Sequence, residues 1–165
     1  MPAVAESEIF QQARSELERA ASSARSAEDL MRNIVTILRD RLPRYNWVGF
    51  YMLDPRQPDI LVLGPYSGAP TPHMRIPLNQ GICGAAASSG VTVVVDDVNS
   101  DPRYLACSIE TKSEIVAPVF VNRKVAGELD IDSHSPGAFG TEDRKLVEYC
   151  AELVGRFLER SAHAV

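Results

Sequence analysis

The segment SEIVAPVFVNRKVAGELDID, residues 113–132, decides the fold because it reads as two β-strands joined by a tight turn at Asn122-Arg123. In its second half, Glu128, Asp130 and Asp132 fall on one face of the strand, and the residues between them are apolar. Neighbouring carboxylates on that face stand roughly 6.6 Å apart and repel one another unless water or a cation screens them. The acidic face is therefore either solvated or the wall of a pocket for a positively charged group.

The remaining sequence predicts an α+β domain around this hairpin. Ser26 is an N-cap signal, Gly90 is a C-terminal cap signal, and Thr141 is expected to cap the last helix. Residues 65–77, which include four prolines, and the polar stretch 96–112 are expected to be loops. The other predicted elements are helices over 5–21, 26–42, 81–89 and 141–158 and strands over 46–53, 59–66 and 91–95. Their order favours an antiparallel sheet with long helices packed on one face.

Length and composition exclude several classes of protein. At 165 residues the chain has the size of one domain, and its 45% hydrophobic and 24% charged residues are typical of a globular protein in water. No apolar run reaches the roughly 18 residues of a membrane span, and the first residues show no secretory signal, so a cytoplasmic location is expected. The net charge is −5, with Lys and Arg scattered, which argues against nucleic acid or an anionic membrane as partner. We expect a small molecule or a protein instead.

The three cysteines, Cys83, Cys107 and Cys150, are widely spaced, which argues against a disulfide framework and against a structural metal site. Cys150 falls on the apolar stripe of the last helix and is expected to be core. Cys83 lies between glycines in the first turn of the helix over 81–89, where the helix N-terminus would lower the pKa of a thiol. The alternative is a buried small residue in a tight turn.

Cys107 differs from the other two because it lies in the long polar loop. A thiol that meets both solvent and a pocket is a candidate nucleophile. The alternative is that Leu105 and Ala106 anchor the loop and take Cys107 into the interior with them. Redox or nucleophilic chemistry is thus one function that the sequence leaves open.

Aromatic residues complete the candidate pocket. Trp47 and Tyr51 are four apart on a predicted strand, so they share a face and stand about 13 Å from each other. Glu114 opens the strand that pairs with the acidic one. Aromatic walls beside a cluster of carboxylates suit a ligand with an ammonium group and an apolar tail. Ordinary aromatic core is the alternative for Trp47 and Tyr51.

In this order, the motifs NWVGFY, LVLGPYSG, RIPLNQGICGAA, ACSIETKSEIVAPV and GELDIDS resemble those of the free methionine-(R)-sulfoxide reductases, which are single GAF domains. The resemblance covers residues 26–160, leaving 1–25 as a helical extension and 161–165 as a tail. It implies a GAF-like fold, a central antiparallel sheet of about six strands with long helices on one face and the ligand enclosed on the other. The extension is expected to be a dimer element or a lid over the sheet.

The resemblance also implies site residues. Trp47 and Tyr51 would surround the methyl sulfoxide of the substrate. The carboxylates of Glu114, Asp130 and Asp132 would bind its amino group and help polarise the sulfoxide oxygen. No metal is implied at this site.

For the cysteines, the resemblance implies that Cys107 is the nucleophile and that Cys83 is the glycine-flanked cysteine of the family. Attack of Cys107 on the sulfoxide would leave a sulfenic acid, and a second thiol would convert it to an intramolecular disulfide. No cofactor would be bound, and the thioredoxin/NADPH system would act as external reductant. A homodimer is also implied.

The sequence departs from the family pattern at His73, which stands where the family normally has a third, resolving cysteine. Either Cys83 resolves the sulfenic acid, which requires its Cα within about 7 Å of that of Cys107, or an external thiol does so. A third possibility is that the protein does not turn over. Two other classes of function therefore stay open, a non-catalytic GAF module that senses a small molecule and a redox-responsive interaction protein.

Overall fold

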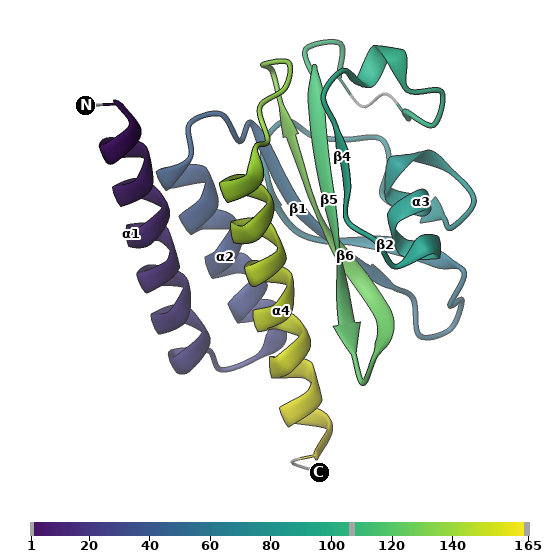
Figure 1. Cartoon of the computed structure of the whole chain (residues 1–165). Helices are drawn as coiled ribbons and strands as arrows, with labels where there is room; N and C mark the ends of the chain where they lie inside the picture. Colours follow the sequence, from purple (N-terminus) through teal and green to yellow (C-terminus); the bar gives the residue numbers. More distant parts are fainter. Residues whose placement is uncertain (1, 106–107, 164–165) are drawn as a thin grey trace.

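The computed structural model describes residues 2–105 and 108–163 as a six-stranded antiparallel sheet with helices on both faces. The strands follow the order β3-β2-β1-β6-β5-β4. Helices α1, α2 and α4 lie side by side on one face, and α3 lies on the other (Figure 1). The elements are α1 (Pro2–Ser23), α2 (Ala27–Arg41), β1 (Trp47–Leu53), β2 (Ile60–Ser67), β3 (Arg75–Pro77), α3 (Gly81–Ser89), β4 (Val93–Val95), the 3-10 helix η1 (Val98–Ser100), β5 (Ser113–Val121), β6 (Lys124–Ser133) and α4 (Thr141–His163).

The hairpin β5–β6 forms where the sequence predicts it. Asn122 and Arg123 both have positive φ angles, 51° and 68°, as the inner residues of a two-residue hairpin turn require. The expected loop over 65–77 is wrong at both ends, because β2 runs to Ser67 and β3 covers Arg75–Pro77. Pro77 is tolerated in β3 because that strand lies at the edge of the sheet.

Two of the three expected helix caps are confirmed. The Ser26 hydroxyl accepts a hydrogen bond from the Asp29 backbone N–H at 3.0 Å, and Gly90 closes α3 in the left-handed region with φ 69°. The expectation for Thr141 is wrong, because Thr141 is the first residue of α4 itself. Gly140 precedes it, accepts a hydrogen bond from Arg144 N at 3.0 Å and donates to the Asp143 carboxylate at 2.9 Å.

Helix α1 belongs to the same core as the rest of the helical layer. Its residues Phe10, Ala13 and Leu17 are buried among side chains of α2, α4 and the sheet. Cys150 of α4 is fully buried in this core, as expected. Since α3 lies on the opposite face of the sheet, α1 is no lid over that face (Figure 1).

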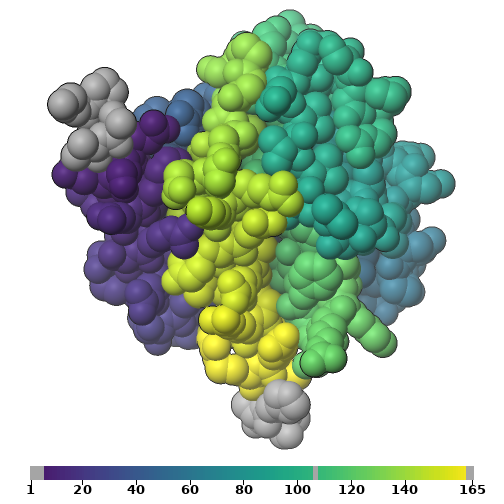
Figure 2. All heavy atoms as spheres, viewed as in Figure 1, coloured from purple at the N-terminus to yellow at the C-terminus, as the bar shows by residue number. Residues whose placement is uncertain are grey.

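Figure 2 shows this helical side of the molecule, with α4 running along its middle between α1 and the β4 side of the sheet. A groove of about 720 Å³ borders α4 and is lined by Phe120 and by charged side chains such as Arg144 and Glu148. None of the candidate site residues that the structure describes lines this groove. In the described part of the chain, no helix has both the length and the apolar character that a membrane crossing needs.

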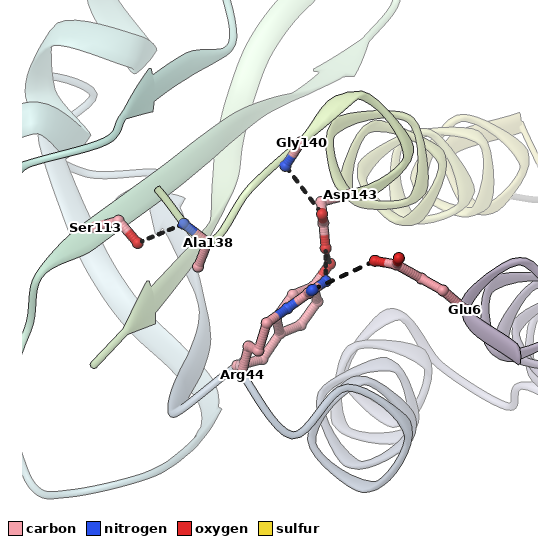
Figure 3. Close-up of polar contacts among 7 residues, drawn as sticks. Glu6, Arg44, Ser113, Ala138, Gly140 and Asp143 are labelled. Carbon is pink, nitrogen blue, oxygen red and sulfur yellow. Dashed lines mark hydrogen bonds and ion pairs between the residues drawn. The ribbon is translucent and has the colours of Figure 1, made fainter. Parts of the chain in front are cut away.

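A buried polar cluster ties the start of α4 to the loop before β1. The Asp143 carboxylate accepts hydrogen bonds from Tyr45 Oη at 2.7 Å and from the Arg44 guanidinium at 3.0 Å, in addition to that from Gly140 (Figure 3). Arg44 also reaches Glu6 of α1 at 3.3 Å. Asp143 and Tyr45 are 4% and 1% exposed, so water cannot replace these donors.

We expect Tyr45→Phe to lower the free energy of unfolding by about 1–2 kcal/mol, because the buried Asp143 carboxylate loses one of its donors. Urea denaturation at neutral pH measures the change. Tyr149→Phe is the matched control, since Tyr149 is only partly buried on α4. Equal losses in the two variants would contradict a special role for the Tyr45–Asp143 bond.

Candidate active site

The acidic face of β6 is buried at the centre of the sheet. The strand register sets Glu128 opposite Tyr51, Asp130 opposite Gly49, and Asp132 between Trp47 and Glu114. The carboxylates therefore share one face with both aromatic residues, as the sequence predicts. Glu114, Glu128, Asp130 and Asp132 are at most 5% exposed, so the solvated-face alternative is wrong.

Within the described part of the chain, three of these carboxylates, Glu114, Glu128 and Asp130, lack the positively charged partners that buried carboxylates usually have. Among the described residues, no hydrogen-bond partner meets Oδ1 of Asp130, and Glu128 has only the weak thiol donor of Cys83 beside it. None of the ion pairs formed by described residues involves Glu114, Glu128 or Asp130. An unpaired negative charge in such a place costs several kcal/mol, roughly, so the groups resist ionisation.

Burial is the main cause of their altered titration. It raises the pKa of Glu128 well above the usual value, with partial opposition from the Cys83 thiol. Burial also raises the pKa of Glu114 well above its usual value, and the charges of Asp130 and Asp132 add to this effect. The pKa of Asp130 is raised by burial as well, although contacts with Glu114 and Cys83 work against it. The site thus holds carboxyl groups that keep a proton to higher pH than exposed carboxyl groups do.

Trp47 and Tyr51 form one continuous aromatic wall. Their ring centroids are 6.2 Å apart with an interplanar angle of 26°, far closer than the strand spacing alone predicts. The indole lies across Gly49, where a Cβ atom would come within 2.4 Å of Cη2 of Trp47. Tyr66 of β2 also stacks on the indole, with the two ring centroids 5.6 Å apart. Gly49 therefore leaves room for the aromatic wall, because a side chain at position 49 would collide with the Trp47 ring.

The polar ends of the same two rings hold the loop between β2 and β3. Trp47 Nε1 donates a hydrogen bond to the Ala69 carbonyl at 3.0 Å, and Tyr51 Oη donates to the His73 carbonyl at 2.8 Å. Gly68 has a φ of 139°, and a Cβ there would meet the Trp47 ring at 2.6 Å. The loop is thereby fixed over the acidic floor, with His73 in the wall of the cavity beneath it.

Cys83 reaches the site from α3. Its Sγ atom and one carboxylate oxygen each from Glu114 and Asp130 lie within 4.8 Å of one another. Gly84 lets the start of α3 pack against the segment that leads into it, because a Cβ there would meet the Leu78 carbonyl oxygen at 2.8 Å. The thiol is buried and unbridged.

The expected lowering of the Cys83 pKa is wrong. Burial raises the pKa of this thiol well above its usual value, and the charges of Asp130, Glu128 and Glu114 raise it further. A helix N-terminus favours a thiolate by about 1 kcal/mol or less at an exposed site, which is less than desolvation beside several carboxylates costs. Burial and the neighbouring carboxylates therefore favour the protonated thiol of Cys83 as long as no cation is bound beside it.

Two small adjoining cavities occupy the space between the loop, α3 and the acidic floor. One, of about 20 Å³, is lined by residues that include Tyr51, His73, Cys83, Glu114 and Asp130. The other, of about 70 Å³, is lined by residues that include Trp47, Ser108 and Asp132, and Thr71 borders both cavities. Ligand pockets typically measure roughly 300–1,000 Å³, so an amino acid fits here only when the walls move apart.

The predicted nucleophile, Cys107, lies outside the described residues, and its role stays a prediction. The nearest described residues on either side are Leu105 and Ser108. Leu105 lines the smaller cavity and Ser108 lines the larger one. The described residues on the two sides of Cys107 in the sequence therefore each line one of the two cavities.

Glu128 is the residue that sequence reasoning left out of the candidate site. It was part of the acidic face, but only Asp130 and Asp132 of that strand were expected to bind a ligand. The register brings Glu128 opposite Tyr51. The Glu128 carboxylate also raises the pKa of the Cys83 thiol. The alternation of residues 127–132 was the signal, since it gives all three acids the same face.

Comparison with known proteins identifies the family. A family model described as GAF domain matches residues 26–158. The chain is 39% identical over 126 residues to Protein YtsP of Bacillus subtilis, covering 76% of each chain. It is 38% identical over 122 residues to the free methionine-R-sulfoxide reductase of Escherichia coli, covering 73% of this chain and 72% of that one.

A solved structure agrees with these matches. The X-ray structure of free methionine-R-sulfoxide reductase from Neisseria meningitidis in complex with its substrate superposes with a TM-score of 0.85 and 34% identity. The match covers 94% of this chain and 93% of that one. The expected six-stranded GAF architecture is confirmed. The chain belongs to the GAF domain family and, within it, to the family of the free methionine-(R)-sulfoxide reductases.

Proposed function

We propose that this protein reduces free L-methionine (R)-sulfoxide to methionine. The observation that carries the proposal is the buried acidic floor, which lies beside a stacked aromatic wall and a thiol in one enclosed site. Relatives of the same family that are named for this activity support it, as does the substrate complex of the Neisseria meningitidis protein.

The site suits a free amino acid because no Lys or Arg is found among the described residues that line the two cavities. The substrate's ammonium group would supply a positive charge to Glu114, Asp130 and Asp132. The methyl sulfoxide would then lie against Trp47 and Tyr51, whose rings form the apolar wall. A methionine sulfoxide residue within a polypeptide has no ammonium group and would leave the carboxylates unpaired, so we expect selection for the free amino acid.

In the proposed reaction, the thiolate of Cys107 attacks the sulfoxide sulfur. A carboxyl group of the floor protonates the sulfoxide oxygen, a role that the raised pKa values of Glu114, Glu128 and Asp130 support. The oxygen passes to Cys107, which becomes a sulfenic acid, and methionine leaves with its sulfur reduced. The cysteine sulfur supplies the two electrons of this step.

Cys83 is the proposed resolving thiol. It would condense with the Cys107 sulfenic acid to give a disulfide and water, and thioredoxin would reduce this disulfide by thiol exchange. Its position beside the cavity and beside Glu114 and Asp130 supports this role, because a carboxylate can accept the thiol proton. His73, at the position of the family's third cysteine, lines the same cavity.

We expect Cys83→Ser to lower turnover with thioredoxin by about tenfold or more, while turnover with dithiothreitol changes little. Dithiothreitol is small enough to reduce the sulfenic acid directly, whereas thioredoxin needs the disulfide. Initial rates of methionine formation with each reductant measure this difference. An equal loss with both reductants would exclude Cys83 as a resolving residue.

The test of the proposed function is consumption of free L-methionine (R)-sulfoxide by the purified protein, coupled to NADPH through thioredoxin and thioredoxin reductase. The (S) epimer and N-acetylmethionine sulfoxide serve as matched substrates, and both should react poorly. Trp47, the one tryptophan of the chain, reports binding through its fluorescence. Saturable methionine binding without turnover would overturn the proposal and favour a sensing module. A homodimer and a cytoplasmic location stay predictions.

A further inference from the structure

Three ligand atoms of metal-binding type converge in the smaller cavity. Cys83 brings its Sγ from α3, Glu114 a carboxylate oxygen from β5, and Asp130 a carboxylate oxygen from β6. These atoms lie within 4.8 Å of one another, and all three residues are at most 6% exposed. The three ligands are far apart in the sequence. The spacing of the cysteines therefore gives no sign of a metal site that they could form with carboxylates.

A second observation independently points to a cation. Asp130 lines the cavity, is 5% exposed, and has an Oδ1 atom without a hydrogen-bond partner among the described residues. Buried polar atoms are satisfied in most folded proteins, so an unsatisfied carboxylate oxygen on a residue of the cavity wall indicates a ligand that supplies positive charge.

The donor set selects the kind of cation. A thiolate with two carboxylates matches Zn²⁺, whereas Mg²⁺ and Ca²⁺ prefer oxygen ligands alone. Around tetrahedral zinc, sulfur and oxygen ligands stand about 3.5 Å apart, so the three side chains would close by about 1 Å. All three ligand residues line the cavity of about 20 Å³, so this cavity is where the ion would bind. Three protein ligands leave one coordination position open.

We propose that this cavity is a binding site for Zn²⁺ or a similar thiophilic divalent ion, held by Cys83, Glu114 and Asp130. The ion excludes the ammonium group of an amino acid, because both would bind the same carboxylates. Metal binding itself does not depend on the proposed reductase activity, but the competition with substrate rests on it. The site would make the protein responsive to free zinc.

Cobalt(II) is the probe for the metal site, because a cobalt–thiolate bond gives a charge-transfer absorption band. The reduced, metal-free full chain is titrated with Co²⁺ and then with Zn²⁺, which should displace cobalt and remove the band. We expect Cys83→Ser to abolish the band and Asp130→Asn to weaken Zn²⁺ affinity by more than about tenfold. Mg²⁺ should have no effect.

Two matched variants separate the proposed site from other thiols. Cys150→Ser removes the buried core cysteine and should leave the cobalt band unchanged. The band should also persist in Cys107→Ser, since Cys107 is not one of the three ligands. A band that is absent from the unmodified protein, or that survives in Cys83→Ser, would overturn the metal site. Near-ultraviolet circular dichroism verifies that each variant is folded.

Competition is measured separately, with the Trp47 fluorescence change on methionine binding. Zn²⁺ should raise the apparent Kd for methionine by more than about tenfold in the unmodified protein and leave it unchanged in Cys83→Ser. Zinc binding without competition would refute the shared site. If methionine does not bind at all, the proposed function fails, while the cobalt band still decides the metal site.

Discussion

The Cys107→Ser variant is expected to lose reduction of free methionine (R)-sulfoxide by at least about 10³-fold, whether thioredoxin or dithiothreitol is the reductant. A serine hydroxyl cannot accept oxygen from a sulfoxide, so the first chemical step has no nucleophile. No reductant can compensate for this loss, because reduction acts only after that step. The measurement is the rate of methionine formation at saturating substrate.

The same variant should still bind methionine. The acidic floor and the aromatic wall come from strands β1, β5 and β6, and the substitution changes none of them. A Kd within about threefold of the unmodified protein, read from Trp47 fluorescence, would show that the loss is chemical. Cys150→Ser, in the helical core, is the control for any cysteine substitution. Full activity in Cys107→Ser would refute the proposed mechanism.

Glu128→Gln is expected to stabilise the protein at about pH 8 by on the order of 2 kcal/mol, because it removes a fully buried carboxylate that has no ion-pair partner among the described residues. Burial raises the pKa of Glu128 above its value in the unfolded chain. The folded protein therefore holds this proton more tightly, and the resulting stability is complete only below the unfolded pKa of about 4.3. It is lost as the pH rises through the folded pKa.

Guanidinium unfolding at several pH values between about 5 and 8 measures this effect. The gain from Glu128→Gln should shrink steadily toward the acidic end, where Glu128 is protonated and resembles glutamine. Glu8→Gln, on the exposed side of α1, is the matched control. A difference between Glu128→Gln and the unmodified protein that does not change with pH would refute the raised pKa.

Sequence reasoning succeeded where the physical cause is local. The cap at Ser26, the left-handed Gly90 and the hairpin turn at Asn122-Arg123 each depend on a few adjacent residues. Strand alternation likewise gave the shared face of Glu128, Asp130 and Asp132. The family resemblance supplied the sixth strand in the expected count but not its position, because a three-residue strand ending in Pro77 has no periodicity to detect.

Sequence reasoning failed where a property of the site depends on several segments that are distant in the sequence. The pKa of Cys83 depends on carboxylates from β5 and β6 and on burial under the β2–β3 loop, none of which helix position reveals. The separation of Trp47 and Tyr51 depends on the ring orientation that Gly49 permits. Long-range packing of this kind is a property of the assembled fold, so no local pattern encodes it.

The two outermost strands of the sheet also limit how copies of this protein can associate. Strands β3 and β4 have three residues each, so little unpaired backbone is offered at either border of the sheet. Long open borders invite strand addition by a second chain and, from there, fibrous aggregation. Pro77 removes one backbone donor from the β3 border as well. Self-association through a shared, continuous sheet is thus disfavoured, and a soluble stock at high concentration should stay free of β-rich aggregates.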